Sequence, residues 1–490
     1  MLLAKLLLVV LPFMCAADKE GSHKGLEAYS SLTPVSGYSQ VVSNKFLNFK
    51  GHAIYPRIKK MSNGEYIMFL QSGRIASTTY CMISKDLVNW DTPQPLFEPY
   101  PVETSVCSED TRAYSTTDGV VLPNGDILAV TSFRAVKSYK KNVGNGLMTR
   151  RSKDNGRTWE PEQIIYEGTN WEPYLLLLPD GRVQCYFTDS DAIEMDSGTS
   201  VMTSDDNGYT WSEKVHCCRQ YKFDNANGTP VHTDQMPCFK VLADGKTLLG
   251  FMEARLQENG EGSPSYYKMS VVRNHSLDWK EVPERTVGPK DRDTNVSGGC
   301  AGYVAVFPSG EVVLSCNLNR KFSLKLGNSS GTEFYGDWDS WYQPFTGSGY
   351  WGSTEVVDSH LMAGCMHCSS GIETGLFYLN HAIKTEKYSD PQKWTKAHFL
   401  YLGSEKGDVV LKASKDKKNL YVRVEGINPT EQLHAEVTVG ENDSIAFDLD
   451  SESGAVEASV PLKTLGKKAK DCEVTLKFND KSVTSKILIN

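Results

Sequence analysis

Two stretches of this 490-residue chain, Ser152-Lys153-Asp154-Asn155-Gly156-Arg157-Thr158-Trp159 and Ser204-Asp205-Asp206-Asn207-Gly208-Tyr209-Thr210-Trp211, read S-x-D-x-G-x-T-W. A looser copy is Ser84-Lys85-Asp86-Leu87-Val88-Asn89-Trp90. The pattern predicts a hairpin turn, because the carboxylate can accept N–H groups of the loop and glycine adopts positive φ. We expect the closing tryptophan to pack beneath the turn.

Six segments share a second pattern, in which a short polar turn joins two apolar runs. The turns are Asn63-Gly64, Asn124-Gly125, Asp180-Gly181, Asp244-Gly245, Ser309-Gly310 and Asp358-Ser359. Asn-Gly and Asp-Gly in this setting predict hairpins with type I′ turns, which need positive φ at both central residues. A tryptophan follows each turn by 26 to 35 residues: Trp90, Trp159, Trp211, Trp279, Trp341 and Trp394.

This repetition predicts the fold. A repeat of about 58 residues with four short strands is typical of a propeller blade, which buries its faces only against neighbouring blades. Six such repeats lie between Phe46 and Trp394. We therefore predict an all-β chain with a six-bladed β-propeller over residues 46–395.

The S-x-D-x-G-x-T-W stretches resemble the Asp-boxes of the sialidase (neuraminidase) superfamily, whose members are six-bladed propellers with this repeat in register. The resemblance covers about 350 residues of the chain. It implies a glycoside hydrolase with its site at one end of the propeller axis.

Composition and the start of the chain narrow the classes further. With 52 Lys+Arg against 60 Asp+Glu, the net charge of −8 argues against a nucleic-acid-binding surface. Residues 1–17 carry Lys5, the apolar run Leu6–Phe13 and small residues, which predicts a signal peptide and a secreted or extracytoplasmic protein. Cys15 is an alternative site for a lipid anchor. No later segment is apolar enough for a membrane span. Residues 18–45, between the signal peptide and the first repeat, are expected to form an N-terminal segment.

Candidate site residues follow from the geometry of propellers, in which residues at the start of each inner strand converge on the axis. This rule selects Arg57, Asp110, Arg112, Glu172, Asp234, Tyr350 and Trp351. Arg255 and Arg320, which follow the second strands of blades four and five, complete the set.

The sialidase resemblance assigns roles to some of these residues. In that family three arginines hold the carboxylate of the sugar, a tyrosine paired with a glutamate attacks the anomeric carbon, and an aspartic acid protonates the leaving oxygen. The resemblance implies that Arg57 and Arg320 are the first and third arginines and that Glu172 and Tyr350 are the catalytic pair. Arg255 is the candidate second arginine. The stretch where the family carries its acid, residues 73–77, has no carboxylate, and Asp110 remains a candidate catalytic carboxyl.

Two other functions stay open. Glu172 and Asp234 open adjacent blades, so they are candidates for a paired-carboxylate site like that of exo-acting arabinanases with sialidase-like propellers. A propeller lectin that binds glycans without turnover is the third possibility. Cys365-Met366-His367-Cys368 is a lone C-x-x-C, so no metal or other cofactor is predicted.

The composition changes after Trp394. Lys-rich turns separate strand-like runs, and residues 396–490 contain no tryptophan. These features predict a separate β-sandwich. Asp408–Ala413 and Asp416–Val422 resemble family 9-type carbohydrate-binding modules.

Taken together, the propeller, its candidate residues and the signal peptide favour a secreted, exo-acting glycosidase that releases a terminal, acidic sugar from a glycan. The oligomeric state is left open.

Overall fold

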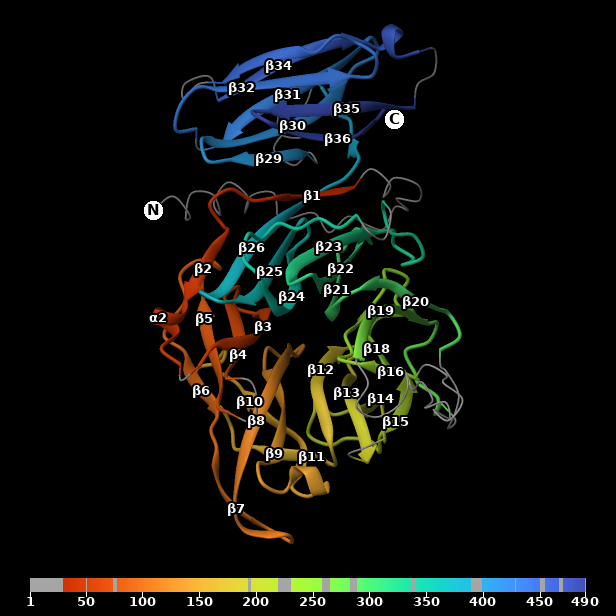
Figure 1. The fold of residues 1–490 in the computed structure, drawn as a ribbon. Helices are drawn as coiled ribbons and strands as arrows, with labels where there is room; N and C mark the ends of the chain where they lie inside the picture. The colour runs from red at the N-terminus through yellow and green to blue at the C-terminus, as the bar shows by residue number, and fades with distance from the viewer. Residues whose placement is uncertain are drawn as a thin grey trace.

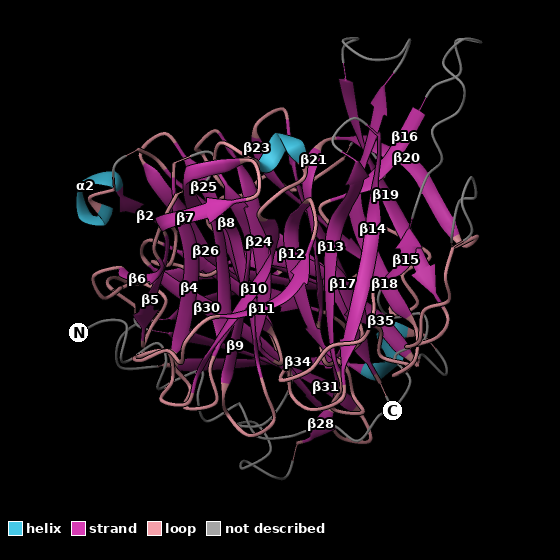
Figure 2. Cartoon of the chain, turned by 90° about the horizontal axis from the view of Figure 1, so that it is seen from below, coloured by secondary structure: helices cyan, strands magenta, loops and turns pink. Residues whose placement is uncertain are grey.

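The computed structural model describes residues 30–49, 51–73, 77–192, 195–218, 231–257, 265–282, 289–336, 340–388, 399–427, 429–449, 454–466 and 470–489. The described chain is built almost entirely of strands (Figure 2). No described helix is long and apolar enough to cross a membrane. The predicted signal peptide, Cys15 and Trp394 lie outside the described residues.

Six antiparallel sheets surround the centre of the larger part of the molecule (Figure 1). Blade one consists of β3 (Ala53–Lys60), β4 (Tyr66–Ser72), β5 (Thr79–Ser84) and β6 (Gln94–Phe97). Blade two consists of β7 (Tyr100–Thr104), β8 (Cys107–Val121), β9 (Ile127–Ala135), β10 (Asn145–Ser152) and β11 (Gln163–Glu167), with the 3-10 helix η3 (Tyr139–Lys141) between β9 and β10. Blade three consists of β12 (Asn170–Leu177), β13 (Val183–Ala192), β14 (Met195–Ser204) and β15 (Val215–Cys218).

The other three blades complete the ring. Blade four consists of β16 (Val231–Gln235), β17 (Phe239–Val241), β18 (Leu248–Gln257), β19 (Ser265–Asn274) and β20 (Arg292–Gly298). Blade five consists of β21 (Cys300–Val306), β22 (Val312–Leu318) and β23 (Lys321–Gly327). Blade six consists of β24 (Gly349–Asp358), β25 (Leu361–Cys368) and β26 (Gly371–Asn380) together with β1 (Ser31–Pro34) and β2 (Gln40–Ser43), which precedes the helix α2 (Asn44–Leu47). The predicted six-bladed propeller is confirmed.

The N-terminal strands close the ring. Both β1 and β2 pair antiparallel with β26, the last strand of the propeller. Without them β26 would leave a row of N–H and C=O groups unpaired. Residues 31–43 therefore belong to blade six, whereas the sequence had placed them in a separate segment before residue 46.

The last part of the chain forms two further five-stranded sheets, drawn in blue in Figure 1. One contains β27 (Ile383–Lys384), β36 (Lys481–Leu488), β35 (Asp471–Phe478), β32 (Leu433–Val439) and β33 (Ile445–Leu449). The other contains β28 (Glu386–Lys387), β29 (Leu400–Ser404), β30 (Gly407–Lys415), β31 (Asn419–Ile427) and β34 (Ala455–Pro461), which leads into the 3-10 helix η5 (Leu462–Leu465). Apolar residues of both sheets share one buried cluster, so they form the predicted β-sandwich. The strands β27 and β28 already pair with these sheets, ahead of the expected limit at residue 396.

The turns within the blades confirm the predicted hairpins but not their type. Gly64 N–H donates to the Met61 carbonyl at 3.0 Å, and Gly125, Gly181, Gly245 and Gly310 donate to the residue three positions earlier in the same way. Gly64 has a φ of 85°, whereas Asn63 is not among the residues with positive φ. The type I′ prediction was wrong, because the Asn63 side chain accepts the Glu65 N–H at 3.1 Å and stabilises a turn in which only glycine is left-handed.

The two S-x-D-x-G-x-T-W stretches fold alike. Asp154 Oδ1 accepts the Thr158 N–H at 2.8 Å and Asp154 Oδ2 accepts the Thr158 hydroxyl at 2.6 Å, and Asp206 accepts the corresponding groups of Thr210 at 2.8 and 2.7 Å. Their tryptophans, Trp159 and Trp211, pack against buried clusters within the propeller. The predicted roles of the carboxylate and the tryptophan are confirmed for both turns.

Candidate functional site

Every inner strand of the propeller carries a left-handed residue near the axis. In five blades the strand register shifts at this residue, and in blade four the residue lies between β16 and β17. We call the six residues the bulge ring; they are Tyr55 (φ 54°), Thr116 (φ 52°), Glu172 (φ 44°), Met236 (φ 50°), Ala301 (φ 56°) and Trp351 (φ 57°). Non-glycine residues adopt this backbone rarely, and such strain concentrates at functional sites.

Polar side chains of neighbouring blades hold the bulge ring in place. Gln71 Oε1 accepts the Thr116 N–H at 2.7 Å, and Thr188 Oγ1 accepts the Met236 N–H at 2.8 Å. Glu253 Oε1 accepts the Ala301 N–H at 2.7 Å. Each acceptor lies on the second strand of the preceding blade, so the packing of the blades maintains the strained backbone.

A small cavity adjoins the bulge ring, four of whose residues line it. It has a volume of about 20 Å³, room for about one water molecule. Its lining includes Tyr55, Arg57, Asp118, Glu172, Tyr174 and Tyr303.

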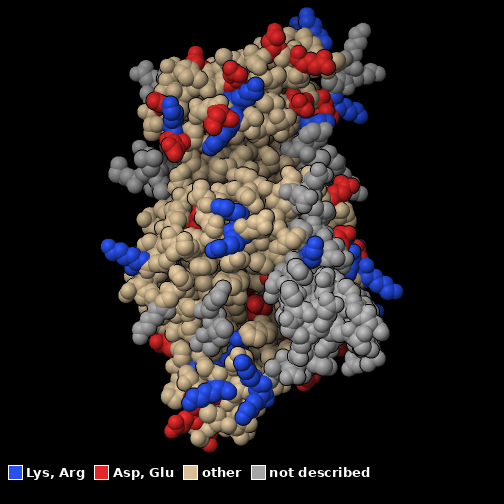
Figure 3. All heavy atoms as spheres, viewed as in Figure 1, with Lys and Arg blue, Asp and Glu red and all other residues tan. Residues whose placement is uncertain are grey.

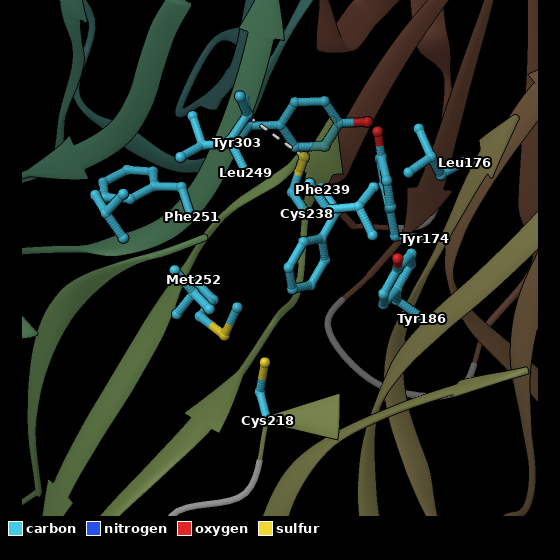
Figure 4. Packing of buried hydrophobic residues seen from close by; sticks show 14 of the residues in the cluster. Tyr174, Leu176, Tyr186, Cys218, Cys238, Phe239, Leu249, Phe251, Met252 and Tyr303 are labelled. Carbon is cyan, nitrogen blue, oxygen red and sulfur yellow. Dashed lines mark hydrogen bonds between the residues drawn. The ribbon is translucent and has the colours of Figure 1, made fainter. Parts of the chain in front are cut away.

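Buried charges lie beneath this cavity. Lys59 Nζ lies 3.1 Å from Asp118 Oδ1 and donates to the Tyr303 hydroxyl at 3.0 Å. The hydroxyls of Tyr303 and Tyr174 point toward one another (Figure 4). Ordered side chains therefore fill this part of the axis.

Glu172 is the member of the bulge ring that carries a carboxyl group. The Thr188 hydroxyl donates to Glu172 Oε2 at 3.3 Å. Burial raises the pKa of Glu172 above its usual range, although Arg134, Thr188, Arg57 and Tyr55 each act to lower it. A carboxyl whose pKa is raised by burial is a candidate for proton transfer.

Tyr55 lies beside Glu172. Burial, followed by the charges of Glu172 and Glu253, raises the pKa of Tyr55 well above its ordinary value. The Tyr55 ring stacks on Trp351, with centroids 4.7 Å apart and planes at 23°. Two carboxyl groups therefore act on one buried tyrosine, whose hydroxyl stays protonated at neutral pH.

Arg134 is the cation that acts most directly on Glu172. Arg134 is the penultimate residue of β9 and is 4% exposed. Its guanidinium carbon lies 3.3 Å from the centroid of the Trp171 ring. Burial lowers the pKa of Arg134 to about 10. Among the described residues, none accepts a hydrogen bond from this guanidinium.

The structure gives several predicted residues other partners. The Arg57 guanidinium donates to the carbonyls of Pro56, Trp351 and Gly352, so it ties blade one to blade six. Asp234 is fully buried and its carboxylate lies 2.8 Å from Arg292 Nη2.

Asp110 and Arg112 stabilise blade two. Asp110 accepts the Lys137 N–H at 2.9 Å and the Ser138 hydroxyl at 2.6 Å, which fixes the loop after β9. Arg112 donates to the Tyr100 hydroxyl at 3.0 Å and lies over the Phe133 ring. The side chain of Arg255 lies outside the described residues.

Tyr350, Trp351 and Arg320 meet in a second cavity, of about 540 Å³, between blades one and six. The Arg320 guanidinium carbon lies 5.6 Å from the centroid of the Tyr350 ring. Trp351 also contacts Tyr55, so this outer cavity adjoins the axial site. Among the residues near this boundary, Tyr55 has its pKa raised in part by the charge of Glu172.

Sequence reasoning missed Tyr55, Arg134 and Glu253. Tyr55 stands in the stretch that pointed to Arg57, two positions earlier. Arg255 was selected because it stands at the end of the second strand of its blade. The same rule applied to β9, the second strand of blade two, would have selected Arg134. No group of three His, Cys, Asp or Glu side chains suited to a metal ion occurs among the described residues.

Comparisons with known proteins bear on the fold. No protein-family model matches the sequence. No curated protein matches it either. Among solved structures, a mutant α-L-arabinofuranosidase of Fusarium graminearum in complex with an iminosugar inhibitor is 16% identical, with a TM-score of 0.50, over 70% of this chain and 98% of that one.

Two further solved structures are similar at lower TM-scores. A protein of unknown function from Dyadobacter fermentans is 15% identical over 72% of this chain and 99% of that one, with a TM-score of 0.48. The NanB sialidase of Streptococcus pneumoniae is 11% identical over 71% of this chain and 70% of that one, with a TM-score of 0.45. At these identities the likeness concerns the propeller fold.

Proposed function

We propose that this protein is an exo-acting glycoside hydrolase of the sialidase-like propellers, which releases a terminal sugar from a glycan outside the cytoplasm. The observation that carries the proposal is the Glu172 carboxyl, held on left-handed backbone at the axis with its pKa raised by burial. Glu172 is assigned the proton transfer at the glycosidic bond, because a carboxyl with a raised pKa keeps more of the protonated form that can donate to the leaving oxygen.

Glu253 is the proposed second carboxyl. Tyr55 responds to the charges of both Glu172 and Glu253, which supports their lying on two sides of one reacting centre. Asp234, the partner proposed from sequence, is neutralised by Arg292. A glutamate pair suits hydrolysis of a neutral sugar, because glycosidases of that kind work with two carboxyl groups at the scissile bond.

Aromatic rings supply the sugar-binding surface. Trp351 stacks on Tyr55 and touches Tyr350, with ring centroids 5.6 Å apart in the second contact. Such rings bind the apolar face of a pyranose or furanose, and their polar neighbours orient the hydroxyls. The sugar is proposed to lie against these aromatic rings, next to the axial cavity.

An acidic terminal sugar is the second candidate, and one observation favours it. The charge of Arg134 acts on Glu172, and the exposed Arg320 lies over the Tyr350 ring. Against three-arginine binding stands Arg57, which donates to three backbone carbonyls. The neutral sugar is therefore the first substrate to test.

The test measures release of chromophore from an α-L-arabinofuranoside and from a sialoside. We expect turnover of the arabinofuranoside, and a loss of about 100-fold or more with Glu172→Gln. Glu213→Gln is the matched control, since Glu213 is exposed on blade three beside the Trp211 turn. Turnover of the sialoside alone would favour the acidic sugar. If the protein binds glycans but turns over neither substrate, the proposed hydrolase function is refuted and the lectin function is supported.

A further inference from the structure

Basic side chains gather beside the candidate site. Lys140 and Lys141 belong to η3, in the loop that joins β9 to β10, and both are exposed. Neither ammonium group makes a hydrogen bond or ion pair with a described residue. Figure 3 shows a group of basic side chains over the lower part of the molecule, where Figure 1 draws β9 and β11. In a chain of net charge −8, this local excess of positive charge stands out.

Arg134 connects this loop with the axial site. Its guanidinium carbon lies 3.3 Å from the centroid of the Trp171 ring, next to Glu172 in the chain, and 5.8 Å from that of Tyr139, the first residue of η3. The basic loop and the bulge ring thus meet at one buried arginine.

The Arg134 guanidinium is unusual in having five N–H donors and no described acceptor at 4% exposure. Burying a charge without a hydrogen-bonding partner is unfavourable, and other buried arginines of this chain have such partners. Arg151, for example, is also 4% exposed and pairs with Asp126 at 3.2 Å. An oxyanion such as a carboxylate or a sulfate fits a guanidinium well, because two of its oxygens take two parallel N–H groups.

Glu172 does not fill this role. Its described hydrogen bonds are with Thr188 and Tyr55, and burial raises its pKa, which favours the neutral carboxyl beside a second anion. An acidic ligand at Arg134 would in turn raise the pKa of Glu172 further. The two groups are therefore compatible with a bound anion between them and the η3 loop.

We propose that Arg134, Lys140 and Lys141 form an anion subsite that binds a carboxylate or sulfate on the glycan unit adjoining the cleaved bond. This inference rests on the proposed hydrolase function. It places the acidic group on the part of the substrate that extends toward blade two, separate from the terminal sugar at Tyr55 and Trp351. Arg134 supplies the paired N–H donors, and the two lysines supply long-range attraction that salt screens.

The test is binding, measured by isothermal titration calorimetry on the full-length Glu172→Gln protein so that no substrate is consumed. The probes are trigalacturonate, a sulfated galactotriose and neutral galactotriose. We expect one or both acidic probes to bind at least tenfold more tightly than the neutral one. Arg134→Met is expected to remove this preference, and Lys140→Gln/Lys141→Gln to weaken it about threefold and to reduce its salt dependence. Lys417→Gln/Lys418→Gln, on an exposed turn of the sandwich, removes the same charge and should change nothing.

The outcomes separate the two proposals. Equal affinity for acidic and neutral probes, or a preference that survives Arg134→Met, overturns the subsite. If Arg134→Met does not fold by its thermal melt, Arg134→Lys decides, since it keeps the charge but loses the paired donors and should weaken binding at least threefold. Tight binding of uronate alone assigns a carboxylate, and of the sulfated probe alone a sulfate. Acidic preference without hydrolysis of any glycoside by the wild-type protein refutes the hydrolase and retains the subsite.

Discussion

Glu172 combines three properties in one residue. Its backbone is left-handed, its carboxyl is buried enough to raise its pKa, and Thr188 and Arg134 act on the charge in the opposite direction. Thr188 serves two bulges at once, because its hydroxyl oxygen also accepts the Met236 N–H. The chemistry of Glu172 therefore depends on a neutral side chain of the neighbouring strand.

Thr188→Val tests this dependence. The valine keeps the shape of the side chain but removes both hydrogen bonds, so we expect a loss of stability of about 1–2 kcal/mol. Since the Thr188 hydroxyl favours the charged carboxylate, its removal should raise the pKa of Glu172. The limb of the kcat/KM pH profile that reports Glu172 should move to higher pH. Thr475→Val, on the exposed face of the sandwich, is the control. A profile that stays in place would show that Thr188 does not act on Glu172.

The sequence pointed to Glu172 and Arg57 as candidate site residues but gave no sign of the backbone partners of Arg57. The start of an inner strand is readable from the pattern of turns, and Glu172 stands there. The acceptors of Arg57 are the carbonyls of Trp351 and Gly352, almost 300 residues away in the chain. The sequence shows that a residue is an arginine, but the carbonyls that accept its hydrogen bonds depend on which blades are neighbours in the folded ring. Tyr55 and Arg134 were missed for the same reason.

At the level of elements, glycines take the left-handed backbone positions of the turns. Both Gly181 and Gly208 are left-handed, with φ of 91° and 88°. Nothing lies within 4 Å of a Cβ added at Gly181, whereas one added at Gly208 would lie 2.4 Å from Leu128 Cδ2. Turn positions were predictable because Asn, Asp and Gly mark them locally. The contact between Gly208 and Leu128 joins two blades and has no local signal.

These two glycines give a matched pair of variants. Gly181→Ala should cost about 1 kcal/mol for its left-handed backbone alone. Gly208→Ala should cost about 2–4 kcal/mol, since steric overlap with Leu128 adds to the same strain. Thermal melts of both proteins measure the difference. Equal losses for the two variants would mean that the blades do not pack at Gly208 as described.

For the whole molecule, the ring and the sandwich meet at β1 and β29. Asn380 Oδ1 of blade six accepts the Tyr401 N–H at 2.7 Å, and Tyr378 stacks on Phe399 with centroids 5.1 Å apart. The sequence predicted both bodies from their different repeats. It did not predict that the first described strands complete blade six, because the sequence of a short strand does not indicate which distant strand it pairs with.

Asp408 makes this junction sensitive to pH. The residue is 2% exposed, and burial raises its pKa to about 6. Because the folded pKa lies above the unfolded value, the protonated form stabilises the protein at low pH, and this contribution is lost as pH rises from about 4 through 6. Asp408→Asn should remove that slope and make the protein more stable at pH 8 by about 3 kcal/mol. Urea unfolding at pH 4 and pH 8 measures it. A wild-type protein whose stability does not fall over this range would contradict the assignment.

We propose that chemistry takes place at the axial bulge ring rather than in the outer cavity between blades one and six. The direct measurement is kcat/KM for release of the terminal sugar by Glu172→Gln and by Tyr350→Phe, on proteins with unchanged thermal melts. We predict a loss of about 100-fold or more for Glu172→Gln, since proton transfer is removed. For Tyr350→Phe we predict a loss below about tenfold, since only a substrate contact changes. A large loss in Tyr350→Phe together with a small one in Glu172→Gln would contradict the account.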